Sequence, residues 1–212
     1  MTAKTIAKSP TARRKGRCSL PERRRALIDA AREVFLERGY ANATIDAVVE
    51  RAGGSKATVY DLFENKEGLL AALVAEATEE LSELVKNYPL DGKIEDDLRD
   101  FGLHYLDILT RPERLALFRL VIGESGRVPE VGDIFYRAGP RAIFQRVADM
   151  LRSAAARGQI KITDAEGMAH FFIDALRGHI HMQVLLNPTR RPTPQEIERH
   201  VDFVVETFLR AC

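Results

Sequence analysis

The segment from Thr44 to Lys66 constrains the fold most, because it holds two short apolar stretches separated by the pair Gly53-Gly54. Apolar residues recur at helical spacing on both sides of the glycines: Ile45, Val48 and Val49 before them, and Val59, Leu62 and Phe63 after them. Thr44 and Ser55 stand directly before the two stretches, where a hydroxyl side chain can cap a helix. The segment therefore predicts two short helices joined by a tight turn, which is the shape of a helix-turn-helix.

The rest of the chain also predicts helices. Four capping boxes of the S/T-x-x-E type mark helix starts, at Ser19–Glu22, Thr110–Glu113, Thr163–Glu166 and Thr193–Glu196. The pair Gly139-Pro140 should kink or split the helix predicted over residues 129–157. No stretch alternates apolar and polar residues as a half-buried strand would. We therefore predict an all-α fold of about nine helices.

The charge of the chain is spread unevenly. Residues 1–66 hold 14 Lys/Arg and 8 Asp/Glu, whereas residues 67–212 hold 18 and 23, although the formal net charge is only +1. A basic N-terminal part on an acidic remainder indicates that this end meets a polyanion. For residues 1–18 the alternative is a solvated, disordered arm that only aids solubility.

A DNA duplex presents dense negative charge, so its binding needs donors and cations at the phosphates and short side chains at the base edges. The Thr44–Lys66 segment offers both kinds of group, and its candidate DNA contacts are Thr44, Ser55, Lys56, Ala57, Thr58, Tyr60 and Lys66. Lys56 can donate to guanine, and the methyl groups of Ala57 and Thr58 can contact a thymine methyl. The first turn of a recognition helix, where these residues lie, is the part that reads bases.

The stretch from Leu27 to Lys66 resembles the DNA-binding domain of the TetR family of transcriptional repressors. The matching pieces are ALIDAAREVFLERGYANATI and DAVVERAGGSKATVYDLFENKEGLL, with the turn glycines, the A-T-V-Y core and the F-x-N-K-x-x-L ending in register. The resemblance implies that Thr44, Tyr60 and Lys66 contact phosphates. It also implies that the first turn of the second short helix faces bases or nearby phosphates.

Two positions depart from the pattern of that family. Gly54 stands where an apolar residue such as valine is usual, which predicts a looser turn. Asp61 and Leu62 stand where an aromatic or histidine pair is common, and the acidic Asp61 should avoid phosphate.

The run RLALFRLVIGESGRVPEVGDIFYRAGPRAI is similar to the C-terminal domains of AcrR/AefR-like members of the family. This resemblance implies a pocket for hydrophobic or drug-like ligands. The candidate lining residues are Phe101, His104, Tyr105, Ile108, Phe118, Ile122, Phe144, Phe171, Asp174 and Arg177. For each aromatic residue the alternative is an ordinary place in the core.

The last two predicted helices differ in kind. The one that ends near Asn187 is apolar nearly all round, whereas the one that follows Thr193 has a single apolar stripe. A helix that is apolar all round is covered on both sides. We therefore expect a homodimer through these two helices, with the central helix of a monomeric core as the alternative.

Other classes of protein and site find little support. The chain lacks the glycine-rich phosphate-binding motifs, and Gly123–Gly126 lacks the spacing and the preceding strand of a nucleophile elbow. His179 and His181 would point apart on a helix, which disfavours a shared metal. We expect no enzyme, cofactor or metal. No apolar run reaches the roughly 18 residues of a membrane span. The cysteines, Cys18 and Cys212, lie near the two ends, so we expect a cytoplasmic location without a membrane.

These inferences divide the chain into a disordered basic arm (residues 1–20), a helix-turn-helix domain (21–66) and a helical ligand-binding and dimerisation domain (67–212). The predicted function is that of a homodimeric repressor on double-stranded DNA. It would be released from a pseudo-palindromic operator by a small hydrophobic effector that moves the helix starting at Lys66. The alternatives are an architectural DNA-binding protein without an effector and an all-α ligand-binding enzyme.

Overall fold

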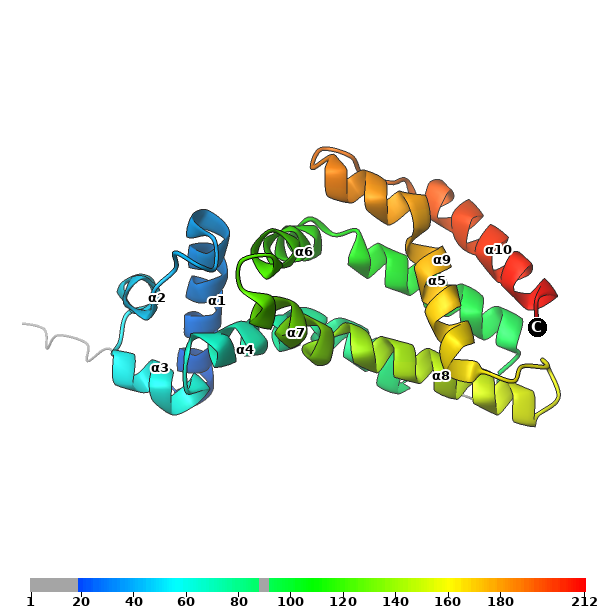
Figure 1. The fold of residues 1–212 in the computed structure, drawn as a ribbon, viewed down its shortest axis with the longest axis horizontal. Coiled ribbons are helices and arrows are strands. Elements are labelled where there is room, and N and C mark those ends of the chain that lie inside the picture. Colours follow the sequence, from blue (N-terminus) through cyan, green and yellow to red (C-terminus); the bar gives the residue numbers. More distant parts are fainter. Residues whose placement is uncertain (1–18, 88–91) are drawn as a thin grey trace, which may run out of the picture.

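The computed structural model describes residues 19–87 and 92–212, and nearly all of the predicted basic arm lies outside these residues. Within them the chain folds into helices alone, as predicted, and Figure 1 shows their arrangement. The helices are α1 (Leu20–Arg38), α2 (Ile45–Ala52), α3 (Lys56–Phe63), α4 (Lys66–Asn87), α5 (Ile94–Leu109), α6 (Pro112–Ser125), α7 (Pro129–Ala138), α8 (Pro140–Ala156), α9 (Ala165–Leu186) and α10 (Pro194–Arg210). The predicted interruption at Gly139-Pro140 separates α7 from α8.

Helices α1 to α3 form a small head at one end of the molecule (Figure 1). The predicted caps are present: the hydroxyl of Ser19 belongs to a complete capping box, Thr44 Oγ1 accepts from the Ala47 amide at 3.2 Å, and Ser55 Oγ accepts from the Thr58 amide at 3.2 Å. Such caps satisfy backbone donors that a helix start would otherwise leave unpaired.

The core of the head extends into α4, α6 and α7. Its buried side chains come from α1 to α4, and Leu117 and Val121 of α6 and Val131 of α7 join the same cluster. Helix α4 leads from the head towards the rest of the molecule, and α6 and α7 lie next to the head (Figure 1). The predicted domain boundary after residue 66 therefore stays a prediction.

We call the remaining helices, α5 to α10, the body, and a second core inside it is built from buried side chains of α5, α8, α9 and α10. Helix α8 packs along α9, and α10 packs on α5 and α9. Phe101, Phe172 and Phe208 are fully buried in this core. Full burial of one such side chain contributes roughly 1.5–3 kcal/mol.

Two of the four predicted capping boxes have a different arrangement. Asp164, rather than Thr163, caps α9, and its Oδ1 accepts from the Gly167 amide at 2.9 Å. Thr110 does not cap α6: its hydroxyl donates to the Leu106 carbonyl of α5 at 2.8 Å. At α9 two neighbouring side chains compete for the same amides, whereas the Thr110 hydroxyl is engaged by the end of α5 and no side chain caps α6.

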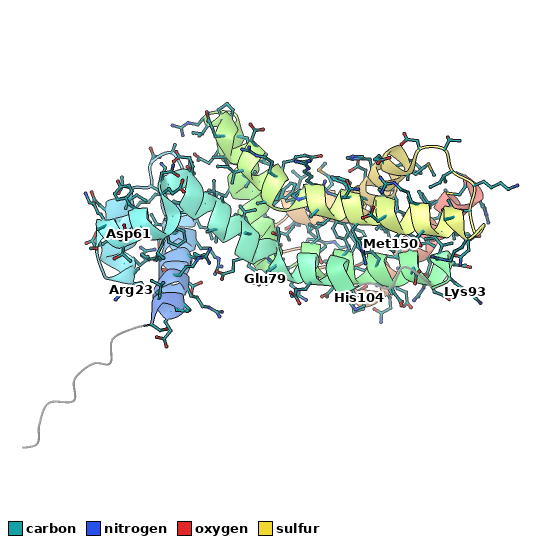
Figure 2. All side chains as sticks on the ribbon, turned by 90° about the horizontal axis from the view of Figure 1, so that it is seen from below. Arg23, Asp61, Glu79, Lys93, His104 and Met150 are labelled. Carbon is teal, nitrogen blue, oxygen red and sulfur yellow. The ribbon has the colours of Figure 1, made fainter. Side chains whose placement is uncertain are left out.

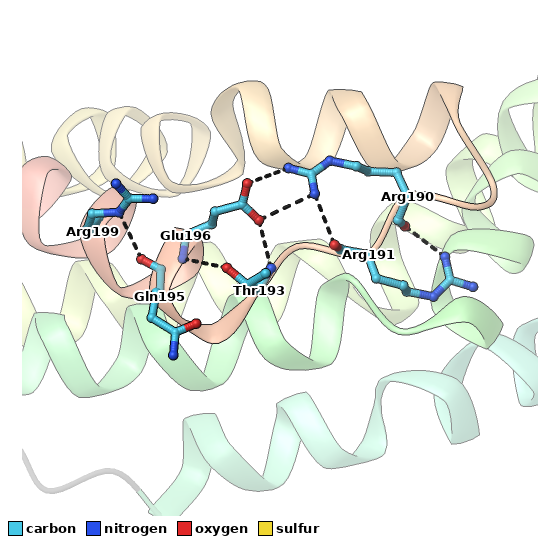
Figure 3. A network of polar contacts seen from close by, with 6 residues as sticks. All are labelled: Arg190, Arg191, Thr193, Gln195, Glu196 and Arg199. Atoms are coloured by element: carbon cyan, nitrogen blue, oxygen red, sulfur yellow. Dashed lines mark hydrogen bonds and ion pairs between the residues drawn. The ribbon is translucent and has the colours of Figure 1, made fainter.

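The capping box of α10 is complete and is reinforced by an ion pair (Figure 3). Glu196 Oε2 accepts from the Thr193 amide at 2.8 Å, and Glu196 Oε1 accepts from Arg190 Nη2 at 2.7 Å. The hydrogen bond from Arg190 is the main cause that holds the pKa of Glu196 at about 2. The network fixes the turn between α9 and α10.

Helix α9 is kinked at Gly178, where φ is 34° and ψ is −143°. The kink frees carbonyl groups that an unbroken helix would pair. His200 of α10 takes them up, since its Nε2 lies 3.2 Å from the Ala175 oxygen and 2.9 Å from the Leu176 oxygen. The side chain thereby ties α10 to the bend in α9.

Candidate nucleic-acid interface and effector pocket

Helix α3 presents a polar face at the surface of the head. It buries Val59 and Phe63 and leaves Lys56, Ala57 and Tyr60 exposed, with half of the Tyr60 side chain accessible. These three side chains recur at helical spacing, so one face of α3 anchors the helix and the other is free. The structure thus brings the predicted base-reading residues to one exposed helix start.

Polar partners within the head hold this face in place. The hydroxyl groups of Ser55 and Thr58 lie 3.0 Å apart, and Lys56 Nζ forms an ion pair with Asp46 of α2 at 2.6 Å. The hydrogen bond to Asp46 raises the pKa of Lys56. Both side chains of the pair are more than half exposed, so water screens the pair and Lys56 can exchange this partner for another acceptor.

Thr44 and Lys66 lie at the starts of α2 and α4. Thr44 is exposed, and the first backbone amides of α2 make this helix start suited to a phosphate. Lys66 is half-buried: its ammonium donates to the carbonyls of Tyr40 at 2.9 Å and Ala43 at 3.1 Å and lies 4.4 Å above the Tyr40 ring. In this structure Lys66 therefore fastens the loop before α2, and its contact with a phosphate stays a prediction.

The turn between α2 and α3 is braced by an arginine of α1. Arg23 Nη1 donates to the Gly53 carbonyl at 3.1 Å. Gly54 has a φ of +110°, and a Cβ placed on it would lie 3.1 Å from the same guanidinium nitrogen. Side chains, and β-branched ones above all, rarely adopt this backbone conformation. The sequence suggested a looser turn at Gly54, whereas the structure shows a turn held from outside.

Sequence reasoning did not single out Arg23 or Arg24 as members of this interface. Arg24 lies over the Phe63 ring, with its guanidinium carbon 5.4 Å from the ring centroid. The run Arg23-Arg24-Arg25 was the available signal, because it stands in the first turns of α1. Figure 2 labels Arg23 and the exposed Asp61 in the head.

The body contains a small apolar cavity of about 50 Å³ between helices α4 to α9. Its lining residues are Thr78, Tyr105, Leu109, Phe118, Phe135, Pro140, Ile143, Phe144, Ile173 and Arg177. The Phe118 and Phe135 rings meet edge to face, with centroids 5.4 Å apart. Of the predicted pocket residues, the structure therefore brings Tyr105, Phe118, Phe144 and Arg177 together.

The other six predicted pocket residues lie elsewhere. Phe101 and Ile108 are buried in the body core, and the exposed residues are His104, Ile122, Phe171 and Asp174. Figure 2 labels His104 on the body, where its Nδ1 lies 2.8 Å from the Asp100 carbonyl of the same helix. Helical spacing placed these residues on apolar stripes, but it did not say which stripe faces the cavity.

Arg177 places a cation at the edge of the mostly apolar cavity. The guanidinium carbon of Arg177 lies 5.3 Å from the Phe118 ring centroid, and its nearest carboxylate, on Asp174, is 4.0 Å away. Burial raises the pKa of Tyr105 to about 12, so its hydroxyl stays neutral and can donate. The arrangement suits an aromatic molecule with an acceptor oxygen.

His181 lies behind Phe118, with ring centroids 5.0 Å apart. Burial, and then the charge of Arg177, lower the pKa of His181 to about 4, so the ring is neutral. Its Nε2 finds no hydrogen-bond partner among the residues described. Among the described residues there is no group of three His, Cys, Asp or Glu side chains that could hold a metal ion.

No helix in the described ranges is long and apolar enough to cross a membrane.

Comparison with known proteins matches two segments of the chain to one family. Residues 27–73 match the family described as bacterial regulatory proteins, tetR family, and residues 96–211 match the C-terminal domain of AefR-like transcriptional repressors. The flavonoid-responsive regulator FrrA has a similar structure, with a TM-score of 0.77 and 31% identity over 91% of this chain and 97% of that one. A TetR transcriptional regulator from Agrobacterium tumefaciens gives a TM-score of 0.71 and 25% identity over 89% and 93%. The HTH-type transcriptional regulator YvkB of Bacillus subtilis is 24% identical over 80% of this chain and 87% of its own.

Proposed function

This chain belongs to the TetR family of transcriptional regulators, with an AefR-like C-terminal domain, and from that premise we propose that it is a homodimeric repressor released from its operator by a small aromatic effector. Regulators of this family bind DNA and small ligands, and the chain is not an enzyme. The observation that carries the proposal is the exposed start of α3, where Lys56, Ala57 and Tyr60 are presented by a buried opposite face. We place the protein with its DNA in the cytoplasm.

At the operator, the residues of the head divide into two roles. Thr44 and Tyr60 bind phosphates, and these contacts set the position of the head without reading sequence. Lys56, Ala57 and Thr58 read bases in the major groove. Lys66 has its ammonium in the loop before α2, so it acts mainly by shaping the start of that helix, to which Thr44 belongs.

Two heads must bind half-sites about 34–36 Å apart, which requires a fixed dimer. Large apolar side chains exposed on α9 and α10 support an interface there: Phe171, Met182 and Leu186 on α9, and Phe203 on α10, are each more than half exposed. Large apolar side chains that gather on an exposed surface are typical of a site that another protein covers. We therefore propose that two copies of the chain dimerise through α9 and α10.

For the effector we propose a planar aromatic compound with phenolic or carboxylate oxygens. The rings that line the cavity favour stacking, and Arg177 and Tyr105 offer donors for the oxygens. The name of FrrA, a flavonoid-responsive regulator at 31% identity, points to the same chemical class. A cavity of about 50 Å³ is far smaller than ligand pockets of roughly 300–1,000 Å³. The effector must therefore push the lining helices apart, and this displacement is what releases the operator.

Selection on random DNA, followed by fluorescence anisotropy at two salt concentrations, tests the DNA half of this proposal. The selected operator should bind at least about a thousandfold more tightly than random DNA. Lys56→Ala should weaken specific binding and relax the preferred sequence, whereas Tyr60→Phe should weaken binding to every sequence alike. Lys161→Ala, at an exposed site in the body, is the matched control. Equal affinity for selected and random DNA would refute a sequence-specific repressor.

A panel of flavonoids and straight-chain fatty acids tests the effector half. Flavonoids should release the selected operator, and fatty acids of similar mass should not, because they cannot stack on the lining rings. Release by fatty acids alone would contradict the proposed class of effector.

A further inference from the structure

A carboxylate of the body accepts a hydrogen bond from a backbone amide of the head. Glu124, in the last turn of α6, accepts from the Ala41 amide at 2.8 Å through its Oε2, although 83 residues separate the two in the sequence. Ala41 belongs to the α1–α2 loop, residues 39–44, which leads directly into Thr44 and α2. We propose that Glu124 is a positioning residue that fixes the orientation of the DNA-binding head and transmits displacement of α6 to it.

The loop is shaped to receive this carboxylate. A Cβ placed on Gly39 would lie 2.8 Å from Glu124 Oε1, which is closer than real Cβ contacts. Glycine at position 39 therefore leaves the space that the second carboxylate oxygen occupies. A side chain there would push the carboxylate away from the Ala41 amide.

Helix α6 contacts the core of the head and the cavity of the body with different faces. Leu117 and Val121 lie in the core of the head, two turns and one turn before Glu124, whereas Phe118 lines the cavity of the body. Arg119 ties the same helix to α9, since its Nε donates to the Leu185 carbonyl at 2.9 Å. A molecule that displaces Phe118 must therefore move a helix whose other face and last turn hold the head.

The α1–α2 loop is held from a second direction by Lys66, which donates to the Tyr40 and Ala43 carbonyls. Glu124 of α6 and Lys66 of α4 thus bind the same short loop. Beside this contact a cleft of about 270 Å³ lies between α1, α4 and α6, and Leu36 and Leu120 are among the residues that line it. Because this cleft leaves space for α1 to move, the hydrogen bond between Ala41 and Glu124 can influence the position of the head.

This inference also gives a role to the Gly123–Gly126 motif, which the function left unexplained. It rests on the proposed function for its link to the cavity, but the hold of Glu124 on the loop can be measured without DNA or effector. Hydrogen exchange of the Ala41 amide, followed by NMR, reports the bond directly.

The test compares Glu124→Ala and Glu124→Gln with Glu113→Ala, a control at an exposed glutamate in the first turn of the same helix. Glu124→Ala should speed exchange of the Ala41 amide at least about tenfold, because a hydrogen bond to a charged acceptor is lost. Glu124→Gln should give a smaller increase, since its amide oxygen can still accept. Glu113→Ala should leave exchange unchanged. Unchanged exchange in Glu124→Ala would overturn the proposal.

The same variants are then titrated with selected operator DNA. Glu124→Ala should bind it roughly fivefold more weakly, a coupling of the usual size between two sites. Faster exchange with unchanged DNA affinity would reduce Glu124 to a structural contact and overturn its positioning role. If the wild-type protein shows no specific DNA binding, the proposed function fails while the exchange result still decides whether Glu124 holds the loop.

A cavity-filling variant tests the path through α6 without any ligand. Leu109→Phe enlarges a side chain that lines the cavity and should speed Ala41 exchange in the wild-type background. In the Glu124→Ala background it should not speed Ala41 exchange further, because the hydrogen bond between Ala41 and residue 124 is already absent. Additive effects of the two substitutions would show that the displacement does not travel through Glu124.

Discussion

Replacing Gly54 by valine should destabilise this protein. The φ of +110° at Gly54 lies where a β-branched residue is strained by about 1–3 kcal/mol. The new Cβ would also lie 3.1 Å from Arg23 Nη1, so the guanidinium must shift, and loss of its hydrogen bond to the Gly53 carbonyl would cost about 1 kcal/mol. The two effects together predict a loss of about 2–4 kcal/mol in the free energy of unfolding.

For a chain of this length, such a loss lowers Tm by roughly 4–16 °C. Calorimetry at one fixed protein concentration should show this decrease, since dimerisation makes Tm depend on concentration. Gly54→Ala should cost less than Gly54→Val, and Arg23→Ala should remove part of the penalty of Gly54→Val because the clash partner is gone. If Gly54→Val leaves Tm unchanged or raises it, the turn does not have the conformation described, and the role of Arg23 as its brace is refuted.

Three further outcomes follow from the body. Phe203→Glu places a charge in the proposed interface and should lower the mass measured by light scattering from twice 23.8 kDa to 23.8 kDa; an unchanged mass would exclude Phe203 from that interface. Arg177→Met keeps the cavity apolar and should weaken binding of an acidic flavonoid by about tenfold or more in calorimetric titration, while equal affinity would show that the cation does not meet the ligand. Because the pKa of Glu196 is held at about 2, below its usual 4.5, its stabilising bond to Arg190 is present above pH 4.5 and is lost as the pH falls towards 2. The difference in Tm between wild type and Glu196→Gln should therefore shrink below pH 4.5, and a difference constant with pH would contradict this cause.

The helices were predictable because their signals are local. A hydroxyl at Ser55 and an apolar spacing of three to four residues are enough to start α3, whatever lies around it. The same local reasoning was wrong at Thr163, since the adjacent Asp164 competes for the same amides and is the cap.

The exposure of a candidate site residue could be predicted only where its own helix determines it. Lys56 and Tyr60 are exposed because Val59 and Phe63 anchor the opposite face of the same helix. In contrast, Phe101 and Tyr105 are one turn apart on α5, yet only Tyr105 lines the cavity. That difference is set by which neighbouring helix packs at each level, and the sequence of α5 does not contain it. The direction of the Lys66 ammonium likewise depends on the loop carbonyls of Tyr40 and Ala43.

The shared core between head and body limits how this protein can be recombined with its relatives. A hybrid sensor that joins a foreign DNA-binding head to this body at residue 66 would leave Leu117, Val121 and Glu124 facing a surface they were not shaped for. The exchange should work better when the side chains at these three positions are transferred together with the head, which already carries the residue at position 39 that must leave room for the carboxylate of Glu124. The unit to be exchanged between such sensors is therefore discontinuous in the chain. It consists of α1 to α3 together with the face of α6 that packs against them.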